Sequence, residues 1–350
     1  MKVIDDKQRT DREMAATLKD VAAHAGVSVR TVSNVVSKFP HVSEDVRTRV
    51  NTAIEVLDYR PNPIARRLRT GLTGVISFIV PEIDVPYFSE LAREVIRAAD
   101  SAGYRVMIDQ TGHDHAHEER LLTGTDRTML FDGMLFAPLV TSKELVAMNR
   151  TSKVPLVLLG EHDFDGSFDH VAIDNVQAAS DAVTHLITTG RSLIAAIGAQ
   201  PREHYATPQQ RTSGYLRALV AAGFTPESTM QIAANRYSRE EGYAAAASLM
   251  KADERPDALF CYSDTLAIGA MRAVFDAGLN VPDDVAVIGI DNIEEGRYAR
   301  PSLSTVSLDT AFVAHEAIAR LTARIADRDA PRVQVVARHE LVVRGSTVRS

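Results

Sequence analysis

The sequence has little sulfur chemistry and no long apolar stretch. Its 350 residues include a single cysteine, Cys261, so no intrachain disulfide can form, and this usage is typical of a reducing compartment. Cys261 lies in the apolar run Ala258-Leu-Phe-Cys261, where we expect a small core residue and not a nucleophile. No run of about 18 apolar residues is present, so the sequence contains no candidate membrane span.

Signatures of catalysis and of secretion are missing as well. We find no nucleophile elbow, phosphate-cradling glycine loop or paired-carboxylate signature, and we expect neither an enzyme nor a cofactor. The tract His113-Asp-His-Ala-His117 has the spacing of a metal site, but a loop before a helix commonly carries polar residues, and we expect no metal there. Residues 1–16 lack the apolar segment of a secretory signal, so we expect a disordered lead-in and a cytoplasmic protein.

Charge is distributed unevenly along the chain. The net charge is −7, yet residues 1–70 contain 13 Lys and Arg against 9 Asp and Glu, which is a local balance of +4. The remaining residues contain 26 basic and 37 acidic side chains, a balance of −11. A basic head on an acidic body is typical of a protein in which one module contacts phosphate groups.

Residues 17–36 predict two short helices joined by a tight turn. Thr17 can cap the first helix, with Asp20 three residues later in a capping-box arrangement. Gly26 ends that helix because glycine adopts the left-handed backbone conformation without a side-chain clash. Ser28 can cap the second helix. The apolar positions that form one small core are Val21, Ala22, Ala25, Val32, Val35 and Val36.

This pattern is that of a helix-turn-helix, whose second helix presents its first residues to base edges and phosphates in DNA. An ordinary helical hairpin is the alternative that the segment alone leaves open. A third helix is predicted after Ser43, which can cap it, because apolar residues then recur at helical spacing. We therefore expect a DNA-binding domain over residues 17–60.

A segment rich in proline and arginine follows that domain. Pro61 and Pro63 interrupt the preceding helix and Gly71 closes the segment, which leaves about two turns of possible helix. A helix this short is marginal in water by itself. Residues 61–71 are therefore either a linker or a hinge helix that forms against a twin copy and DNA, with Leu68 as an apolar wedge in the minor groove.

From residue 72 to residue 350, short β-branched runs alternate with amphipathic helices. Near-continuous apolar strands between helices indicate parallel sheets covered on both faces, so the fold class is α/β. About ten strands exceed one comfortable sheet, and we predict two doubly wound lobes with a cleft between them. The predicted strands are residues 74–80, 104–108, 133–137, 155–159, 171–173, 192–197, 258–261 and 285–290. The predicted helices are residues 88–102, 118–130, 174–189, 209–222, 239–251 and 265–277.

Short motifs along residues 17–347 resemble the landmarks of one protein family, in that family's order. In the first part of the chain they are Leu18-Lys-Asp-Val-Ala22, Ala25-Gly-Val-Ser28, Thr31-Val-Ser33, His41-Val-Ser43 and Tyr59-Arg-Pro-Asn-Pro63. Farther on they are Asp132-Gly133, Asp174-Asn175, residues 211–215, Ser263-Asp264, Gly289-Ile-Asp-Asn292, Ser304-Thr-Val306 and Leu341-Val-Val-Arg-Gly345. Taken together, they resemble the lactose-repressor (LacI/GalR) family of bacterial transcription regulators.

The resemblance implies a homodimer in which each subunit reads half of a near-palindromic double-stranded DNA operator. It also implies two lobes of the periplasmic-binding-protein type that close on a small effector, a sugar or a related metabolite, and thereby change DNA affinity. Val29, Arg30 and Asn34 occupy the base-reading positions of the family, and arginine and asparagine can make bidentate contacts with guanine and adenine. The further DNA-contact candidates are Ser28, Thr31, Ser33, Asn62, Arg66, Leu68 and Arg69.

Seven residues are candidates for the effector site. Arg211 and Asp291 match family positions that hold hydroxyl or carboxylate groups of the effector. Phe88 and Tyr237 match positions where an aromatic face stacks on a ring, and simple packing is the alternative for Tyr237. The others are Thr207, Ser263 and Asp264, and N-capping of a helix accounts for the last two equally well.

One departure from the family pattern concerns the effector. Sugar-responsive members often carry an Asp-Arg pair after the strand at residues 155–159, whereas Gly160-Glu161 stands here, so no standard monosaccharide is assigned. We predict a repressor that responds to a small molecule. A periplasmic-type solute receptor without DNA function is the alternative, and the missing secretory signal and the arginine-bearing hinge count against it.

Overall fold

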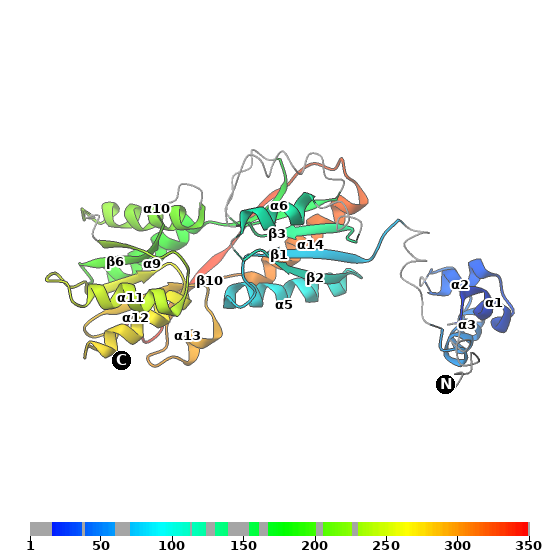
Figure 1. Ribbon diagram of the computed structural model, residues 1–350, viewed down its shortest axis with the longest axis horizontal. Coiled ribbons are helices and arrows are strands. Elements are labelled where there is room, and N and C mark those ends of the chain that lie inside the picture. The colour runs from blue at the N-terminus through cyan, green and yellow to red at the C-terminus, as the bar shows by residue number, and fades with distance from the viewer. Residues whose placement is uncertain are drawn as a thin grey trace, which may run out of the picture. The chain divides into compact units, whose positions relative to one another are not determined.

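The computed structural model describes residues 16–36, 39–59, 71–112, 114–123, 130–138, 154–160, 167–200, 206–225 and 230–348. The chain divides into two compact units, residues 1–73 and residues 74–350 (Figure 1). Nowhere in the described ranges is a helix both long and apolar enough to cross a membrane. Apart from residues 16 and 71, the predicted lead-in and the predicted hinge lie outside the described residues.

The first unit contains helices α1 (Leu18–Ala25), α2 (Val29–Val36) and α3 (Glu44–Val56). Thr17 Oγ1 accepts a hydrogen bond from the Asp20 N–H at 3.4 Å, and the Asp20 carboxylate accepts from the Thr17 N–H at 2.8 Å, so the predicted capping box forms. Gly26 ends α1 with a φ of +62°. Ser43 precedes α3 but makes no capping hydrogen bond with its side chain, which corrects that prediction.

One small core holds these three helices together. Its buried members come from all of them and from the residue that follows α3, and they are Val21, Ala22, Ala25, Val32, Val35, Val50, Ala53 and Tyr59. Most valines and alanines of α1 and α2 therefore pack in this core, whereas Ala23 and Val29 are exposed. The polar start of α2 is left at the surface.

The second unit begins with a lobe built on a six-stranded parallel sheet in the order β11-β5-β4-β3-β1-β2. Its strands are β1 (Val75–Val80), β2 (Arg105–Gln110), β3 (Gly133–Phe136), β4 (Leu156–Leu159), β5 (Asp169–Ile173) and β11 (Gln334–Ala337). Its helices are α5 (Pro86–Ser101), α6 (His115–Thr123) and α14 (Thr310–Ala326). Alternate residues of β1 belong to two separate cores, because Phe78 clusters with residues of α5 and α14 whereas Ile79 clusters with Leu121 and Leu122 of α6.

The second lobe is built on another six-stranded sheet, in the order β12-β10-β9-β8-β6-β7. Its strands are β6 (Ile194–Ala199), β7 (Gln231–Ala233), β8 (Ala258–Cys261), β9 (Ala286–Ile290), β10 (Ser304–Leu308) and β12 (His339–Val342), and only β12 is antiparallel to its neighbour. Its helices are α9 (Asn175–Thr188), α10 (Ala206–Ala221), α11 (Arg239–Leu249), α12 (Asp264–Asp276) and α13 (Glu294–Tyr298). The α9–α10 pair and the α11–α12 pair cover opposite faces of this sheet (Figure 1).

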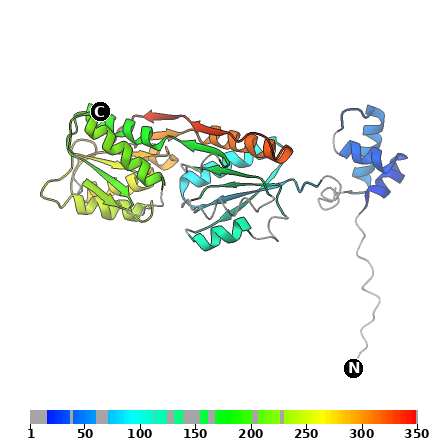
Figure 2. The same cartoon turned by 90° about the horizontal axis from the view of Figure 1, so that it is seen from above.

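The chain passes between the lobes after β5, after β10 and between β11 and β12. The last passage is the red segment that runs along both lobes in Figure 2. The predicted α/β architecture with two parallel-sheet lobes is confirmed. Helices α13 and α14 and strands β7, β10, β11 and β12 are absent from the elements predicted above, although apolar residues recur at helical spacing along α14.

Candidate functional site

A cavity lies between the two lobes, at the carboxyl ends of parallel strands from both sheets. This edge is where open α/β sheets bind ligands, because the loops that follow the strands converge there. Its described lining consists of Pro81, Glu82, Val85, Tyr87, Phe88, Leu91, Ala137, Pro138, Leu159, Gly160 and Ile173 from the first lobe, and Gln200, Thr207, Pro208, Arg211, Asn235, Arg236, Tyr237, Ser263, Asp291 and Leu308 from the second. The structure thus brings together all but one of the seven residues predicted for the effector site.

Arg211 is the buried cation of the cavity. It lies on α10, where its Nε donates to Asn175 Oδ1 at 2.6 Å and its Nη1 donates to the carbonyl oxygen of Tyr262. Asn175 is itself fully buried at the start of α9, so it holds the arginine in one orientation. The Nη2 edge is the part of the guanidinium that remains for a ligand.

Two of the other lining residues have local structural roles. The Ser263 hydroxyl accepts from the Leu266 N–H at 3.2 Å and caps α12, which is the capping role considered above. The Tyr237 hydroxyl donates to the Gly198 carbonyl oxygen at 3.3 Å, so its ring is anchored at its far end while one side borders the cavity. Both residues can still present a surface to a ligand.

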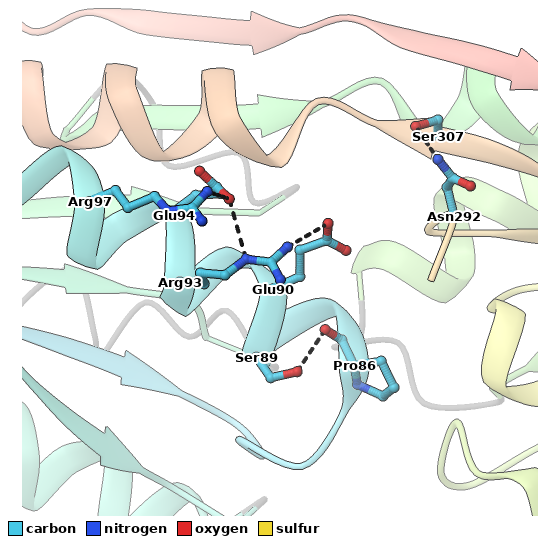
Figure 3. Close-up of polar contacts among 8 residues, drawn as sticks. All are labelled: Pro86, Ser89, Glu90, Arg93, Glu94, Arg97, Asn292 and Ser307. Carbon is cyan, nitrogen blue, oxygen red and sulfur yellow. Dashed lines mark hydrogen bonds and ion pairs between the residues drawn. The ribbon is translucent and has the colours of Figure 1, made fainter. Parts of the chain in front are cut away.

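Asp291 reaches the cavity from a strained turn. Asp291 and Asn292 follow β9 with φ angles of +117° and +59°, a region that residues other than glycine rarely adopt. The turn is held at several points. Asn292 Nδ2 donates to Ser307 Oγ at 3.0 Å (Figure 3). Asn292 also donates its N–H to Thr305 Oγ1 at 3.2 Å, and its Oδ1 accepts from Arg344 Nη2 at 2.6 Å.

Asp264 does not contact the cavity, which corrects its assignment as a direct effector ligand. It has no exposed surface, and its carboxylate accepts from the Thr305 hydroxyl at 2.6 Å and from the Ile293 N–H at 3.0 Å. Burial raises the pKa of Asp264 well above its ordinary value, and the negative charge of Asp291 raises it further. Asp264 lies behind Asp291 and supports the turn that presents it.

An ion pair joins the two lobes at the cavity. Arg236, which follows β7, pairs through its guanidinium with Glu82, which follows β1. The Glu241 carboxylate fixes the backbone of this loop by accepting from the Asn235 N–H at 2.5 Å and the Arg236 N–H at 3.2 Å. The sequence did not point to this pair, and it gave Asn175 only as part of a family motif, without a role. The signal that could have found the pair is position, because both partners directly follow predicted or observed parallel strands.

The candidate DNA-contact residues lie on α2 and just before it. Ser28, Val29 and Arg30 are exposed, and Thr31 and Asn34 are half-buried. Ser28 Oγ accepts from the Thr31 N–H at 3.1 Å, so it caps α2 as predicted. Ser33 is only 8 % exposed, so the structure corrects its assignment as a phosphate contact. The four remaining candidates, Asn62, Arg66, Leu68 and Arg69, lie outside the described residues.

No group of three or more metal-ligating side chains occurs among the residues that the structure describes. His113 and Glu161, singled out in the sequence, fall outside that part of the chain, and the side chain of His115 is not described. The cavity lining offers Glu82 and Asp291 as acids, and Glu82 is paired with Arg236.

Comparisons with known proteins identify the family. Residues 17–62 match the model for "Bacterial regulatory proteins, lacI family", and residues 183–347 match a periplasmic binding protein-like domain. The transcriptional repressor CytR of Escherichia coli K12 is 32 % identical over 340 residues, which cover 96 % of this chain and 97 % of the relative. The chain belongs to the LacI family.

Solved structures of LacI-family regulators have the same fold. The transcriptional regulator CelR, solved in complex with cellobiose, is 29 % identical with a TM-score of 0.72 and covers 95 % of this chain and 99 % of that one. The lac repressor dimer bound to operator and the anti-inducer ONPF has a TM-score of 0.82 at 23 % identity over 95 % of this chain and 99 % of that one, which is a likeness of fold alone. The LacI-family protein described here is a DNA-binding transcriptional regulator and not an enzyme, and the alternative of a solute receptor without DNA function is set aside.

Proposed function

We propose that this LacI-family protein is a cytoplasmic repressor that binds a near-palindromic operator as a homodimer and changes its operator affinity when a small molecule, a sugar or related metabolite, occupies the cavity between its lobes. The observation that carries the proposal is the cavity itself. Its walls come from both lobes, and it gathers Arg211, Asp291, Phe88 and Tyr237 around one space. A ligand that touches both lobes stabilises one lobe arrangement over another, which is the differential affinity that control requires.

For DNA reading, the proposal assigns the base contacts to Val29, Arg30 and Asn34 at the start of α2. Arg30 is exposed and can make a bidentate contact with guanine, and Asn34 can do the same with adenine. Ser28 and Thr31 would contact phosphates and fix the register of α2. The proposed domains are a DNA-binding domain at residues 17–60, a hinge helix at 61–71 and an effector domain at 72–350.

The test begins by selecting an operator for the full-length protein from a pool of random DNA. We expect a near-palindromic site that binds one dimer. Arg30→Ala should cost about 1–3 kcal/mol on that site and relax base preference at one position of each half-site. Failure to select any sequence, or a uniform loss on all sequences, would contradict the assignment.

The second arm concerns control by the cavity. Once a ligand that changes operator binding is found, Arg211→Met should remove the response while operator binding without ligand stays intact. The Arg211 guanidinium is buried beside Asn175, so Arg211→Lys is the companion variant that keeps the charge but not both donor contacts. An unchanged ligand response in Arg211→Met would place the effector elsewhere.

A further inference from the structure

The described walls of the cavity differ in chemistry between the two lobes. The first lobe contributes carbon surface from Val85, Phe88, Leu91, Leu159 and Ile173, and its one charged lining residue, Glu82, is paired with Arg236. The second lobe contributes the polar groups, with hydrogen-bonding side chains after several of its strands. A ligand that fills this space therefore meets apolar surface on one side and directional hydrogen bonds on the other.

The charges in the described lining cancel. Arg211 and Arg236 are balanced by Asp291 and Glu82, and Arg236 is already engaged by Glu82. A phosphate group would bring two negative charges beside Asp291 without an unengaged partner other than Arg211 in the described lining. Bringing like charges together in a partly buried site is costly, so the lining favours a neutral ligand.

The remaining donor edge of Arg211 favours a hydroxyl group over a carboxylate. The side-on fork that grips a carboxylate uses the Nε and Nη2 hydrogens together, and here Nε is committed to Asn175. Nη2 can still donate to a single acceptor. Asp291 on the same wall accepts hydrogen bonds, and a hydroxyl both accepts and donates, so neighbouring hydroxyls on one ring satisfy the two residues.

Among the described residues of the first-lobe wall, the side-chain groups that can hydrogen-bond to sugar hydroxyls are those of Glu82 and Tyr87, and Glu82 is paired with Arg236. Gly160 has a φ of +110°, so a side chain there would be strained, and the glycine supplies no side chain to this wall. The Gly160 N–H donates a hydrogen bond to the Val171 carbonyl oxygen at 3.1 Å. A free hexose has hydroxyls around its whole ring, and those buried against this wall would lose hydration without a side-chain partner from Gly160.

Resting on the proposed function, we propose that the effector is a neutral glycoside with a planar aromatic substituent. Its hydroxyl-bearing ring lies against the second lobe at Arg211 and Asp291, and its substituent lies against Phe88, Leu91 and Leu159 of the first lobe. An aryl glycoside and a ribonucleoside share this chemistry, because each joins a ring carrying hydroxyls to a flat aromatic ring whose faces can pack against carbon surface.

The test measures binding to the full-length protein by calorimetry with a matched panel. The panel contains glucose, galactose, xylose and ribose, their phenyl glycosides, the ribonucleosides, and the corresponding sugar and nucleoside monophosphates. We expect at least one phenyl glycoside or nucleoside to bind at least tenfold tighter than its free sugar and its phosphate, which is about 1.4 kcal/mol. Comparing the affinities of the phenyl glycosides with those of the nucleosides then shows which of the two kinds of ligand the cavity prefers. Equal binding of the free sugar, tighter binding of the phosphate, or no binding by any glycoside or nucleoside would overturn the inference.

A pair of variants tests the assignment of the apolar wall. Phe88→Ala should weaken the bound glycoside at least tenfold while a free sugar loses no more than twofold, because only the substituent contacts Phe88. Phe275→Ala is the matched control, since that phenylalanine is exposed on α12 away from the described lining, and it should change neither value. If the glycoside binds but operator affinity stays constant, the proposed function fails and the ligand class stands. If only free sugars shift operator affinity, the ligand class fails and the proposed function stands.

Discussion

Arg49 on α3 fastens the turn between α1 and α2, and its removal should change how the protein reads DNA. Its Nη2 donates to the Ala25 carbonyl oxygen at 2.5 Å and to the Gly26 carbonyl oxygen at 3.3 Å, and its Nη1 lies 3.7 Å from an Asp45 carboxylate oxygen. These carbonyls end α1, so the arginine caps that helix with a positive charge. The direction in which α2 leaves the turn therefore depends on a side chain from the third helix.

The free energy lost on removing the Arg49 hydrogen bonds depends on how far they are exposed to solvent. A hydrogen bond that involves a charged group contributes roughly 1.5–3 kcal/mol when it is well buried. The Arg49 side chain is 47 % exposed, so solvent screening reduces this, and we take about 1 kcal/mol for Arg49→Met. Methionine keeps the apolar stem but loses the donors. Because the contact lies within the protein, its loss lowers the free energy of unfolding of the first unit by about 1 kcal/mol. Operator affinity should fall by at most about fivefold, the limit reached when all of that energy serves to hold α2 in its DNA-binding orientation, because about 1.4 kcal/mol corresponds to tenfold.

The assay compares the selected operator with a scrambled sequence over a range of salt concentrations. If Arg49 acts by positioning α2, Arg49→Met loses affinity for the operator, keeps its affinity for scrambled DNA within about twofold, and keeps the slope of log K against log salt. Arg49→Lys should recover part of the loss, since lysine can still donate to one carbonyl. The control is Arg47→Met, which removes the same charge from the same helix at a residue that bonds to the Phe39 carbonyl oxygen instead.

The opposite outcome is as well defined. If Arg49 were a phosphate contact, both DNA sequences would lose affinity together and the salt slope would fall by about 0.9. That result would refute the positioning role and identify Arg49 as a direct contact with DNA phosphates. A loss of thermal stability in the first unit without any loss of operator discrimination would refute it too.

Three further predictions concern the second unit. Gly269→Ala should destabilise this unit by about 1–3 kcal/mol or more in thermal unfolding, because the added methyl group would overlap the Arg239 carbonyl oxygen where α11 crosses α12. Burial lowers the pKa of His185 below 6.5, so its contribution to the free energy of unfolding is present above pH 6.5 and is lost as the pH falls. The free energy of unfolding of His185→Gln should therefore depend less on pH between about pH 7.5 and 5.5 than that of the unchanged protein. An unchanged pH dependence would contradict this. Asp264→Asn should weaken effector binding at least tenfold in calorimetry, through a displaced turn, while the exposed Asp276→Asn leaves it unchanged.

Features set by neighbouring residues were predictable from the sequence. The Thr17–Asp20 capping box and the Gly26 turn depend on residues three or four positions apart, and both form as expected. The buried parallel strand β10 was missed, because the polar residues Ser304, Thr305 and Ser307 interrupt its apolar ones. Buried parallel strands with continuous apolar runs, such as β4 and β9, were predictable. Strands β7, β11 and β12 were not, since they lie at or near sheet edges and carry exposed or polar residues such as Gln231 and Gln334.

Features set by distant residues were not predictable from local patterns. The resemblance to the family named Arg211 and Asp291, and both line the cavity. It could not give the partner of Arg211, because Asn175 is 36 residues away, nor the ion pair between Glu82 and Arg236, which are 154 residues apart. Ser33 was assigned to DNA by its place in a motif, whereas the helix period turns it toward the core.

Packing decides which of two aspartates, Asp264 or Asp291, lines the cavity and which is buried behind it. Asp264 and Asp291 each follow a parallel strand of the second sheet, and the sequence ranks Asp291 above Asp264, which N-capping of a helix explains equally well. Burying a carboxylate costs free energy unless donors replace its hydration, and the chain supplies two donors to Asp264, from Thr305 and Ile293. It also leaves room for that carboxylate by placing Gly289 where any Cβ would strike it. These contacts surround a side chain that is buried and does not line the cavity. They hold the turn at Asn292 and Ile293 in place, and that turn keeps Asp291 at the cavity despite its unfavourable φ of +117°.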